Sequence, residues 1–543
     1  MLLLAHNIIS PLGFTTEENY RAVSEGRTAL AHHENSRGVP FPYHAALMTE
    51  EQWKKITLPG HTRFESMVIN SIEDAVRQTT IDVASPRTTL IISTTKGDIL
   101  TSPALTAQRI ARHVGVTTEP IVVCNACISG VAAQVLALRL TESGYCDNAI
   151  VAGADVLGDF IISGFQSLKA LSAKACRPFD AERLGLNLGE AAATMIFTRS
   201  TTADGKEAWH VADGAIRNDA YHISGPHPKG EGCLRALRRV MGRKEDLALV
   251  GVHGTATMYN DQMESKAIER AGLSDIPLSA LKGYYGHTLG AAGLVETIIT
   301  ARALDDGIIL PSKGYGERGV SGRVTISPQA MTTDKREFIK ILSGFGGGNA
   351  AIRLTKHPTG QTLTTRRHAV RSVAEYNLPL TDTDSLNTLY TNEIGGYPKF
   401  HKMDVLSRLT FVATEMLIHR NPTVLPSQEQ RDEALAVVLF NNSSSVVADR
   451  AYMETIADKE AYFPSPSLFV HTLPNICAGE IALRHALHGE TSFYILPQCN
   501  EAMMQEIVSA TMLDSGTTAV LAGWVECPDK QKGEGRVRLF SSL

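Results

Sequence analysis

Short apolar runs alternate with longer helical stretches along most of this 543-residue chain, and no other feature constrains its fold as strongly. Such alternation is typical of α/β proteins. At about 150 residues per domain, the length predicts three or four domain-sized units. We predict strands at Leu90–Ser93, Ile121–Cys124, Ala149–Ala152, Ala193–Phe197, Leu249–His253 and Phe338–Leu342, with helices between them.

Composition and charge exclude several classes of protein. The apolar and charged fractions, 43% and 20%, are ordinary for a globular chain and exclude a disordered or coiled-coil protein. The 52 basic and 57 acidic residues show no basic stripe, which argues against a nucleic acid partner. No apolar stretch is long enough for a membrane span and the N-terminus lacks signal-peptide features, so we expect a cytoplasmic protein. The eight cysteines are too sparse for a disulfide framework, and one CxxC pair gives little support for zinc.

The C-terminal third repeats part of the N-terminal region in diverged form. A polar stretch at 355–371 interrupts the alternation and indicates a linker. After it, LAVVLFNNSSSV is similar to the earlier TLIISTTKGDI, SLFVHTLPNICAGE to EPIVVCNACISG, and AVLAGWVE to AIVAGADV, in the same order. This alignment pairs Cys477 with Cys127. Chance similarity among apolar strands is the alternative.

Cys127 is the first candidate for chemistry. It lies between a predicted strand and a helix that is apolar on nearly every face, where free backbone N–H groups and the positive end of the helix dipole favour thiolate over thiol. Taken alone, a free cysteine is more often a small buried hydrophobe. Three later segments make a catalytic role for Cys127 more plausible than a structural one. VHGTATMYNDQMES contains His253, LKGYYGHTLGAAGLVE contains Lys282 and His287, and GFGGGNA surrounds Phe345 with glycine. The last lacks the GxGxxG spacing of a dinucleotide loop.

Taken in order, these segments resemble the motifs of the β-ketoacyl-acyl-carrier-protein synthases, the condensing enzymes of fatty acid and polyketide synthesis. The motifs are NACISG, CRPFDAERLGLNLGEAAA, HGTATMYND, LKGYYGHTLGAAG and GFGGGNA, and the likeness covers approximately residues 1–355. It implies a thiolase-like, five-layered αβαβα fold, followed by a half-thiolase-like α/β domain. We therefore predict two halves of the synthase at 1–205 and 206–355, a linker at 356–374 and a degenerate half-domain at 375–543.

The resemblance implies a Cys-His-His site that performs a decarboxylative Claisen condensation. Cys127 would take an acyl group from a carrier-protein phosphopantetheine. His253 and His287 would hydrogen-bond the thioester carbonyl of a malonyl unit and stabilise the enolate formed when carbon dioxide leaves. The tetrahedral oxyanion would rest on the backbone N–H groups of Cys127 and Phe345, at about 3 kcal/mol per donor, with Gly346 in the same gate.

Other residues have supporting roles in this resemblance. Lys282 matches the family's invariant lysine and would pair with Glu296, and we assign the pair to positioning and electrostatics rather than proton transfer. The remaining supporting residues are Thr255, Asp261, Glu264 and Asn349, and an ion pair on a helix surface explains Glu264 equally well. No metal or organic cofactor is implied, because the pantetheine arm arrives with the carrier protein, while a structural cation is left open.

The implied partners are an acyl-carrier protein and a second copy of the chain in a homodimer. Candidates for carrier docking are Lys54, Lys55 and Arg63, although a solvated helix face explains them equally well. A half-fold leaves one sheet face uncovered, so we expect 375–543 to pair with another protomer or with a further ketosynthase-like protein. Without histidines opposite it, Cys477 would be structural.

Other functions compete with condensation. The alternative is a non-catalytic scaffold that binds a carrier protein or a second synthase, and the intact Cys127, His253, His287 and Lys282 disfavour it. Thiolases need a second catalytic cysteine, and short-chain initiating synthases use asparagine where this chain has His287, so both lose ground.

Several departures from the family motifs bear on the acyl pocket. Ile128 stands where small residues are common, Gly348 where threonine is usual, and Tyr284 and Tyr285 add bulk beside His287. The length of the acyl substrate therefore does not follow by analogy. The opening strand is also expected to be short, because it begins almost at the SPLG motif.

Overall fold

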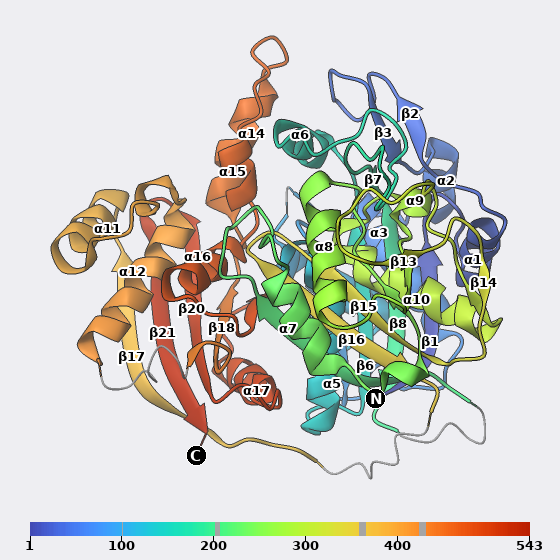
Figure 1. Cartoon of the computed structure of the whole chain (residues 1–543). Coiled ribbons are helices and arrows are strands. Elements are labelled where there is room, and N and C mark those ends of the chain that lie inside the picture. Colours follow the sequence, from blue (N-terminus) through green and yellow to red (C-terminus); the bar gives the residue numbers. More distant parts are fainter. Residues whose placement is uncertain (100, 201–206, 358–364, 423–430, 543) are drawn as a thin grey trace.

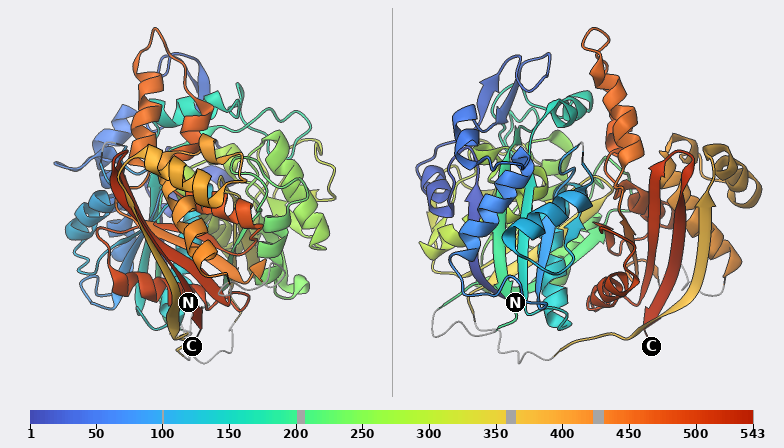
Figure 2. Two further views of the ribbon diagram at one scale, coloured as in Figure 1. Left: turned by 90° about the vertical axis from the view of Figure 1, so that its left-hand side faces the viewer. Right: turned by 180° about the vertical axis from the view of Figure 1, so that it is seen from behind.

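The computed structural model describes residues 1–99, 101–200, 207–357, 365–422 and 431–542 (Figures 1 and 2). Within these residues, sixteen strands form one continuous sheet and two small sheets lie apart from it. The strand order across the large sheet is β13-β11-β10-β15-β16-β9-β1-β8-β6-β4-β5-β19-β18-β20-β21-β17. The order falls into an N-terminal, a middle and a C-terminal set of strands, which share edges.

The N-terminal set has β4, β5 and β6 parallel, with β8 and β1 added antiparallel. Its strands are β1 (Leu2–Ile9), β4 (Thr88–Ser93), β5 (Ile121–Val123), β6 (Asn148–Asp155) and β8 (Ala191–Thr198). Its helices are α1 (Thr16–Ser24), α2 (Glu50–Ile56), α3 (Arg63–Val76), α4 (Pro103–Val114), α5 (Ser129–Glu142) and α6 (Asp159–Ser167). A small sheet joins β2 (Ala31–His33), β3 (Tyr43–Ala46) and β7 (Leu188–Gly189).

The middle set has the same plan and contains β9 (His210–Asn218), β10 (Leu247–Gly251), β11 (Pro277–Ser279), β13 (Thr325–Ile326), β15 (Glu337–Ser343) and β16 (Gly348–Thr355). Its helices are α7 (Glu231–Val240), α8 (Met258–Arg270), α9 (Lys282–Tyr285) and α10 (Ala292–Asp305). A short ladder pairs β12 (Ile308–Ile309) with β14 (Met331–Thr332). All six predicted strands are present in the first two sets, although β10 ends two residues before His253.

Two buried helices form the middle layer between these sets. Helix α5 contacts β4 and β6 on one side and β9 and β16 on the other, and α10 packs beside it. Glycine allows this approach, because a Cβ at Gly293 would lie 2.4 Å from the backbone nitrogen of Val131. Helix α3 covers the outer face of the N-terminal set of strands, and α7 covers the outer face of the middle set. This is the αβαβα layering that the sequence predicts.

The C-terminal set repeats the strand order of the N-terminal one. Its strands are β17 (Val370–Leu380), β18 (Leu435–Asn441), β19 (Thr491–Ile495), β20 (Ala519–Asp529) and β21 (Lys532–Ser542). Its helices are α11 (Thr383–Leu389), α12 (Val405–Arg420), α14 (Val446–Ala457), α15 (Pro466–His471), α16 (Ile476–His485) and α17 (Glu501–Thr511). The order β19-β18-β20-β21-β17 mirrors β5-β4-β6-β8-β1, so the internal repeat is present in the topology.

The C-terminal set docks on the same chain. Strand β19 pairs antiparallel with β5, and Phe493 N–H donates to Asn125 Oδ1 at 2.6 Å. Arg139 of α5 reaches Glu490 across the boundary at 2.6 Å, with both side chains buried. Figure 1 shows this set, in orange and red, beside the rest of the molecule. The expectation that 375–543 must cover an open sheet face by pairing with another protomer or a further protein is therefore wrong, because this set packs on its own chain, with α17 against α5 and β19 against β5.

Both faces of the C-terminal sheet are packed in part by helices of the same chain, α12 on one face and α17 on the other. Helix α12 covers one face of β17, β20 and β21. On the other face, Arg538 pairs with Glu375 at 3.0 Å and with Glu501 at 2.5 Å, and Arg536 pairs with Glu501 at 2.9 Å. Glu501 belongs to α17, so these ion pairs join α17 to β21 on that face. The predicted homodimer stays a prediction, and it cannot use the β5 edge, which β19 already occupies.

The alignment of Cys477 with Cys127 is also wrong. The segment SLFVH, aligned above with a strand, lies in helix α15, and Cys477 lies in α16, which precedes β19 instead of following it. A short apolar run cannot by itself distinguish a buried helix from a strand. Ser465 and Pro466 were the available signal, because serine at the N-cap followed by proline marks a helix start.

Smaller differences concern the ends of elements. Strand β1 has eight residues and is not short. Strand β17 begins at Val370, inside the predicted linker 356–374, and the predicted boundary between 205 and 206 lies outside the described residues. Thr15 and Glu18 form the capping-box hydrogen bonds ahead of α1. In the described part of the chain, no helix has the length and hydrophobicity that a bilayer crossing requires.

Candidate active site

Cys127 lies where β5 ends and α5 begins. Ala126 has a left-handed backbone (φ 49°), which costs a non-glycine residue about 1 kcal/mol or more. The turn is fixed by Ser129, whose Oγ accepts from Asn125 N–H (2.8 Å) and donates to the Ala126 carbonyl (2.6 Å). Cys127 itself sits in the short 3₁₀ turn η1 (Ala126–Ile128) and is 8% exposed. The strand-to-helix turn that the sequence predicts therefore holds the sulfur in a strained, defined position.

Two histidines come from loops far downstream. His253 follows β10, and Glu264 of α8 fixes its loop by accepting the N–H groups of His253 (2.6 Å) and Gly254 (2.7 Å). His287 follows α9, and its Nδ1 accepts the Leu289 N–H at 3.1 Å. Nε2 of His287 must then carry the hydrogen, and this buried atom has no partner among the described residues. The Nε2–H group can therefore donate a hydrogen bond to a bound substrate.

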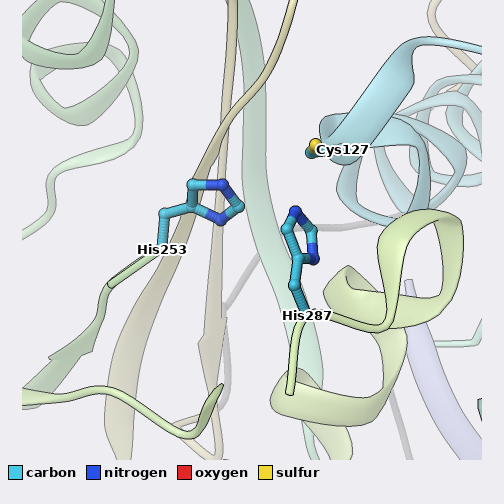
Figure 3. Close-up of side chains that lie close together, drawn as sticks. All are labelled: Cys127, His253 and His287. Atoms are coloured by element: carbon cyan, nitrogen blue, oxygen red, sulfur yellow. The ribbon is translucent and has the colours of Figure 1, made fainter. Parts of the chain in front are cut away.

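The structure brings the three side chains together. A ring nitrogen of each histidine and Sγ of Cys127 lie within 4.8 Å of one another. The two imidazole rings are 5.0 Å apart and nearly perpendicular. Figure 3 shows both rings directed toward Cys127 from opposite loops. A group bound at Cys127 would therefore lie against both imidazoles.

Two backbone N–H groups at the cavity beside Cys127 have no backbone partner among the described residues. Neither the Cys127 nor the Phe345 N–H donates to the backbone of another residue in the described ranges. The Cys127 N–H interacts with its own thiol, which lowers the pKa of that thiol by less than burial raises it. Phe345 belongs to the turn between β15 and β16, which is closed by a bond from Gly344 N–H to the Gly348 carbonyl (2.8 Å). Gly344 lies against Cys127, since a Cβ at Gly344 would be 3.2 Å from the Cys127 nitrogen. These two donors have the composition of an oxyanion hole.

A buried ion cluster supports the histidine loops. Lys282 Nζ donates to the His253 carbonyl (2.7 Å) and to Glu296 Oε1 (2.6 Å). Lys340 of β15 donates to the Val252 carbonyl at 2.7 Å and pairs with the other oxygen of Glu296. Sequence reasoning paired Lys282 with Glu296 but missed Lys340. The signal was a lysine inside an otherwise apolar strand, EFIKILS, which must be paired if buried.

Replacing Glu296 with glutamine is expected to destabilise the fold by about 3 to 5 kcal/mol, because it leaves two buried ammonium groups without their shared carboxylate. Lys282 and Lys340 are each 1% exposed, so solvent cannot compensate. Urea unfolding followed by circular dichroism measures the change. As a control, Glu17→Gln removes a carboxylate that is 61% exposed in its pair with Arg302 and should leave stability nearly unchanged. Equal stabilities of the two variants would contradict the cluster's role.

The other predicted supporting residues make hydrogen bonds within the surrounding loops. Asp261 accepts the Phe179 N–H at 2.7 Å, and Thr255 shares a hydrogen bond with Thr257 at 2.9 Å. Asn349 donates to Asp219 at 3.1 Å. Gly346 is left-handed (φ 87°) and its N–H donates to the Ile223 carbonyl at 2.7 Å. Helix-surface exposure is wrong for Glu264, which is fully buried.

Electrostatics sets the protonation of the three groups. Burial, and then the charge of Lys282, lowers the pKa of His253 and of His287 well below the usual 6.5, so both imidazoles are neutral at pH 7. Burial also raises the pKa of the Cys127 thiol to about 12, and the charge of Lys282 offsets this only in part. The expectation of a resting thiolate is therefore not met, because desolvation outweighs the helix N-terminus.

A pH dependence follows from this. With a pKa raised to about 12, the thiolate fraction of Cys127 should grow about tenfold per pH unit between pH 7 and 9.5. We expect the rate of alkylation by iodoacetamide, measured by peptide mass spectrometry, to rise along that whole range. A plateau near pH 8 would mean that the thiol is activated instead.

A cavity of about 20 Å³ lies at the Cys127 sulfur, where the C-terminal set meets the N-terminal and middle sets. The N-terminal and middle sets contribute Thr95, Lys96, Ala126, Cys127, Ile161, Phe165, Leu289 and Phe345, while Phe469, Thr472 and Leu473 come from the C-terminal set. Sequence reasoning missed this second group, because the repeat was expected to face another protomer. The space is about that of one water molecule.

Two of the departures from the family motifs compensate for each other. A Cβ at Gly348 would lie 2.9 Å from Cδ1 of Ile128. In this packing, Ile128 after Cys127 occupies the space that a side chain at 348 would enter. The departures at these two positions form a single packing change.

Two family models match the N-terminal and the middle parts of the chain separately. The model of the "Beta-ketoacyl synthase, N-terminal domain" matches residues 70–203, and that of the C-terminal domain matches residues 210–315. The chain is 34% identical over 256 residues to 3-oxoacyl-(acyl-carrier-protein) synthase 2 of Rhizobium meliloti, which covers 43% of this chain and 60% of the relative. It is 29% identical over 272 residues to the tetracenomycin polyketide synthase ketoacyl synthase alpha subunit of Streptomyces glaucescens, with 47% and 64% covered. The chain thus spans less than two thirds of these relatives.

Solved structures support the thiolase-like fold. A structure described as "PfaC Keto synthase-Chain length factor" has a TM-score of 0.75 at 14% identity and covers 100% of this chain and 78% of its own. "The ishigamide ketosynthase/chain length factor" has a TM-score of 0.59 at 23% identity and covers 66% of this chain and 98% of its own. At such identities the likeness concerns the fold alone.

Proposed function

Residues 70–203 and 210–315 belong to the beta-ketoacyl synthase family, and from this premise we propose that the chain catalyses a decarboxylative Claisen condensation. An acyl group on Cys127 would be joined to a malonyl unit on an acyl-carrier protein, giving a 3-oxoacyl thioester. The observation that carries the proposal is the convergence of one sulfur and two neutral imidazoles within 4.8 Å, beside two N–H groups that have no backbone partner among the described residues.

Acyl transfer is the first step. Cys127 Sγ attacks the thioester carbonyl of the acyl donor, the new C–S bond forms, and the carrier thiol leaves with the proton of the Cys127 thiol. Negative charge on the tetrahedral oxygen is met by the N–H groups of Cys127 and Phe345, each worth about 3 kcal/mol in such a site. The high pKa of the thiol means that its proton leaves during the attack and not before it.

Decarboxylation and condensation follow. The malonyl thioester carbonyl lies between the two imidazoles, and Nε2–H of His287 donates to it. The C–C bond to the carboxylate breaks, carbon dioxide leaves, and the electron pair forms an enolate that hydrogen bonds from neutral donors stabilise. Its carbon attacks the acyl-Cys127 carbonyl, the C–S bond breaks, and Cys127 leaves as a thiolate that takes up a proton from solvent. Lys282, Glu296 and Lys340 hold the loops and transfer no proton.

The partners follow from the chemistry. The pantetheine arm would arrive on an acyl-carrier protein, so the chain itself needs no organic cofactor. Docking at Lys54, Lys55 and Arg63, the homodimer and a cytoplasmic location stay predictions. Of these docking residues, Arg63 pairs with Glu50 at 2.6 Å, which weakens its availability to an acidic carrier.

A reconstituted assay tests the proposal. The chain is incubated with acyl-carrier thioesters of graded length and with malonyl-carrier protein, and products are identified by mass spectrometry. One acyl adduct on Cys127 and a 3-oxoacyl product are expected. An unmodified Cys127 thiol with every donor would instead favour the non-catalytic scaffold.

A further inference from the structure

The turn that carries the Phe345 N–H is held through three of its other backbone groups, the Gly346 N–H, the Gly346 carbonyl and the Phe345 carbonyl. Gly346 N–H donates to the Ile223 carbonyl (2.7 Å), and the Gly346 carbonyl accepts from Asn218 Nδ2 (2.8 Å). These partners belong to the middle set. The Phe345 carbonyl is different, because its donor is Nδ2 of Asn475, at 2.8 Å, from the C-terminal set. A residue of the repeat thus contacts the backbone of a proposed oxyanion-hole residue.

Asn475 stands at a helix N-cap but does not cap the helix with its side chain. It is the N-cap residue of α16, where an asparagine normally accepts a backbone N–H of the first turn, yet its side chain makes no capping bond. The side chain is 7% exposed, and its Oδ1 has no partner within the described ranges. Loss of a cap costs about 1 kcal/mol. The orientation is fixed, since only the amide nitrogen can donate to a carbonyl.

Close packing brings α16 to the turn. A Cβ at Gly479 would lie 2.6 Å from the Gly346 carbonyl oxygen, and a Cβ at Gly346 would lie 2.6 Å from Asn475 Nδ2. Glycine at both positions therefore lets the first turn of α16 lie directly on the turn between β15 and β16. The contact depends on the absence of two side chains as well as on the presence of Asn475.

We propose that Asn475 is a positioning residue for acyl transfer, which makes the C-terminal half-fold a working part of the active site. The N–H and carbonyl of Phe345 belong to one residue, so holding the carbonyl restricts rotation of its backbone and keeps the N–H directed at the oxyanion. Displacement by about 1 Å is enough to cost a large part of such a contribution. The inference rests on the proposed function, since it concerns the same oxyanion hole.

Asn475→Asp is the sharpest test, because aspartate keeps the shape of asparagine but cannot donate when ionised. With hexanoyl-N-acetylcysteamine as acyl donor to the full-length chain, we expect kcat for acylation of Cys127 to fall at least tenfold, with KM within twofold. We expect the same fall in kcat for acylation in Asn475→Ala, which also lacks the donor. Carbon dioxide release from malonyl-N-acetylcysteamine without an acyl donor should stay within twofold in both variants, because the imidazoles stabilise that enolate. Decarboxylation therefore also reports that the variants are folded.

Asn500→Ala provides the matched control. Asn500 is an N-cap in the same set and does accept the Met503 N–H, so its loss should lower the melting temperature and leave acylation unchanged. Wild-type acylation in Asn475→Asp would overturn the inference, and so would an equal fall in acylation and decarboxylation. If the unaltered chain showed neither reaction, the proposed function would fail as a whole, which the wild-type sample reveals separately.

Discussion

Cys127→Ala is expected to abolish condensation, with a fall of at least about 10³-fold in the rate of 3-oxoacyl product formation. Removing the sulfur removes the atom that carries the acyl group between the two half-reactions, and no other group in the site can form a thioester. The rate is measured by mass spectrometry of carrier-bound products. The acyl adduct found on the wild-type peptide should be absent from the variant.

Cys477→Ala is the control for this experiment. Cys477 is buried to 1% exposure in α16, where its Sγ contacts the Pro474 carbonyl at 3.0 Å. Its removal deletes one buried atom and should cost some stability, about 1 kcal/mol. Condensation should continue at the wild-type rate. Condensation that survives Cys127→Ala but stops in Cys477→Ala would reverse the two assignments.

His287→Ala has the second largest expected effect, a loss of malonyl decarboxylation by about 10² to 10³-fold. Nε2–H of His287 is a buried donor with no partner in the described part of the chain, and the Leu289 N–H at Nδ1 holds the ring in place. Alanine therefore removes a preorganised contact to the enolate. Acylation of Cys127 uses backbone donors and should persist. Release of carbon dioxide and the mass of the Cys127 peptide are measured in the same samples.

His253→Ala should resemble His287→Ala, because the rings face the same space 5.0 Å apart. His485→Ala is the matched control, since His485 is half-buried in α16 and pairs with Glu415 at 2.5 Å, away from the site. Decarboxylation unaffected by either substitution at 253 or 287 would contradict the role of the imidazoles. Loss of acylation together with decarboxylation would point to a collapsed site.

Prediction from the sequence succeeded where local patterns decide. Strands of β-branched residues, the capping box at Thr15 and the largely apolar α5 depend on neighbours in the chain, and each forms as expected. The convergence of Cys127, His253 and His287 followed from the family motifs. Prediction failed at SLFVH, where a short apolar run fits both a helix and a strand.

The expected thiolate failed for a different reason. The helix N-terminus at Cys127 is a local feature, and it is present. Desolvation depends on everything packed around the sulfur, including Phe469 and Leu473 from more than 300 residues away. The residues next to Cys127 in the sequence therefore do not predict how strongly desolvation raises the pKa of its thiol.

The sequence by itself determined the α/β class and the turn at Cys127, because those depend on periodicity and on adjacent residues, and the resemblance to the family motifs singled out the two histidines. Only the tertiary structure decided that the C-terminal repeat completes its own chain, through pairing of β19 with β5. It alone also revealed Lys340 in the ion cluster and Asn475 on the Phe345 carbonyl. These are contacts between residues distant in the chain, and which of many apolar edges and buried polar groups meet is settled by packing, not by local pattern.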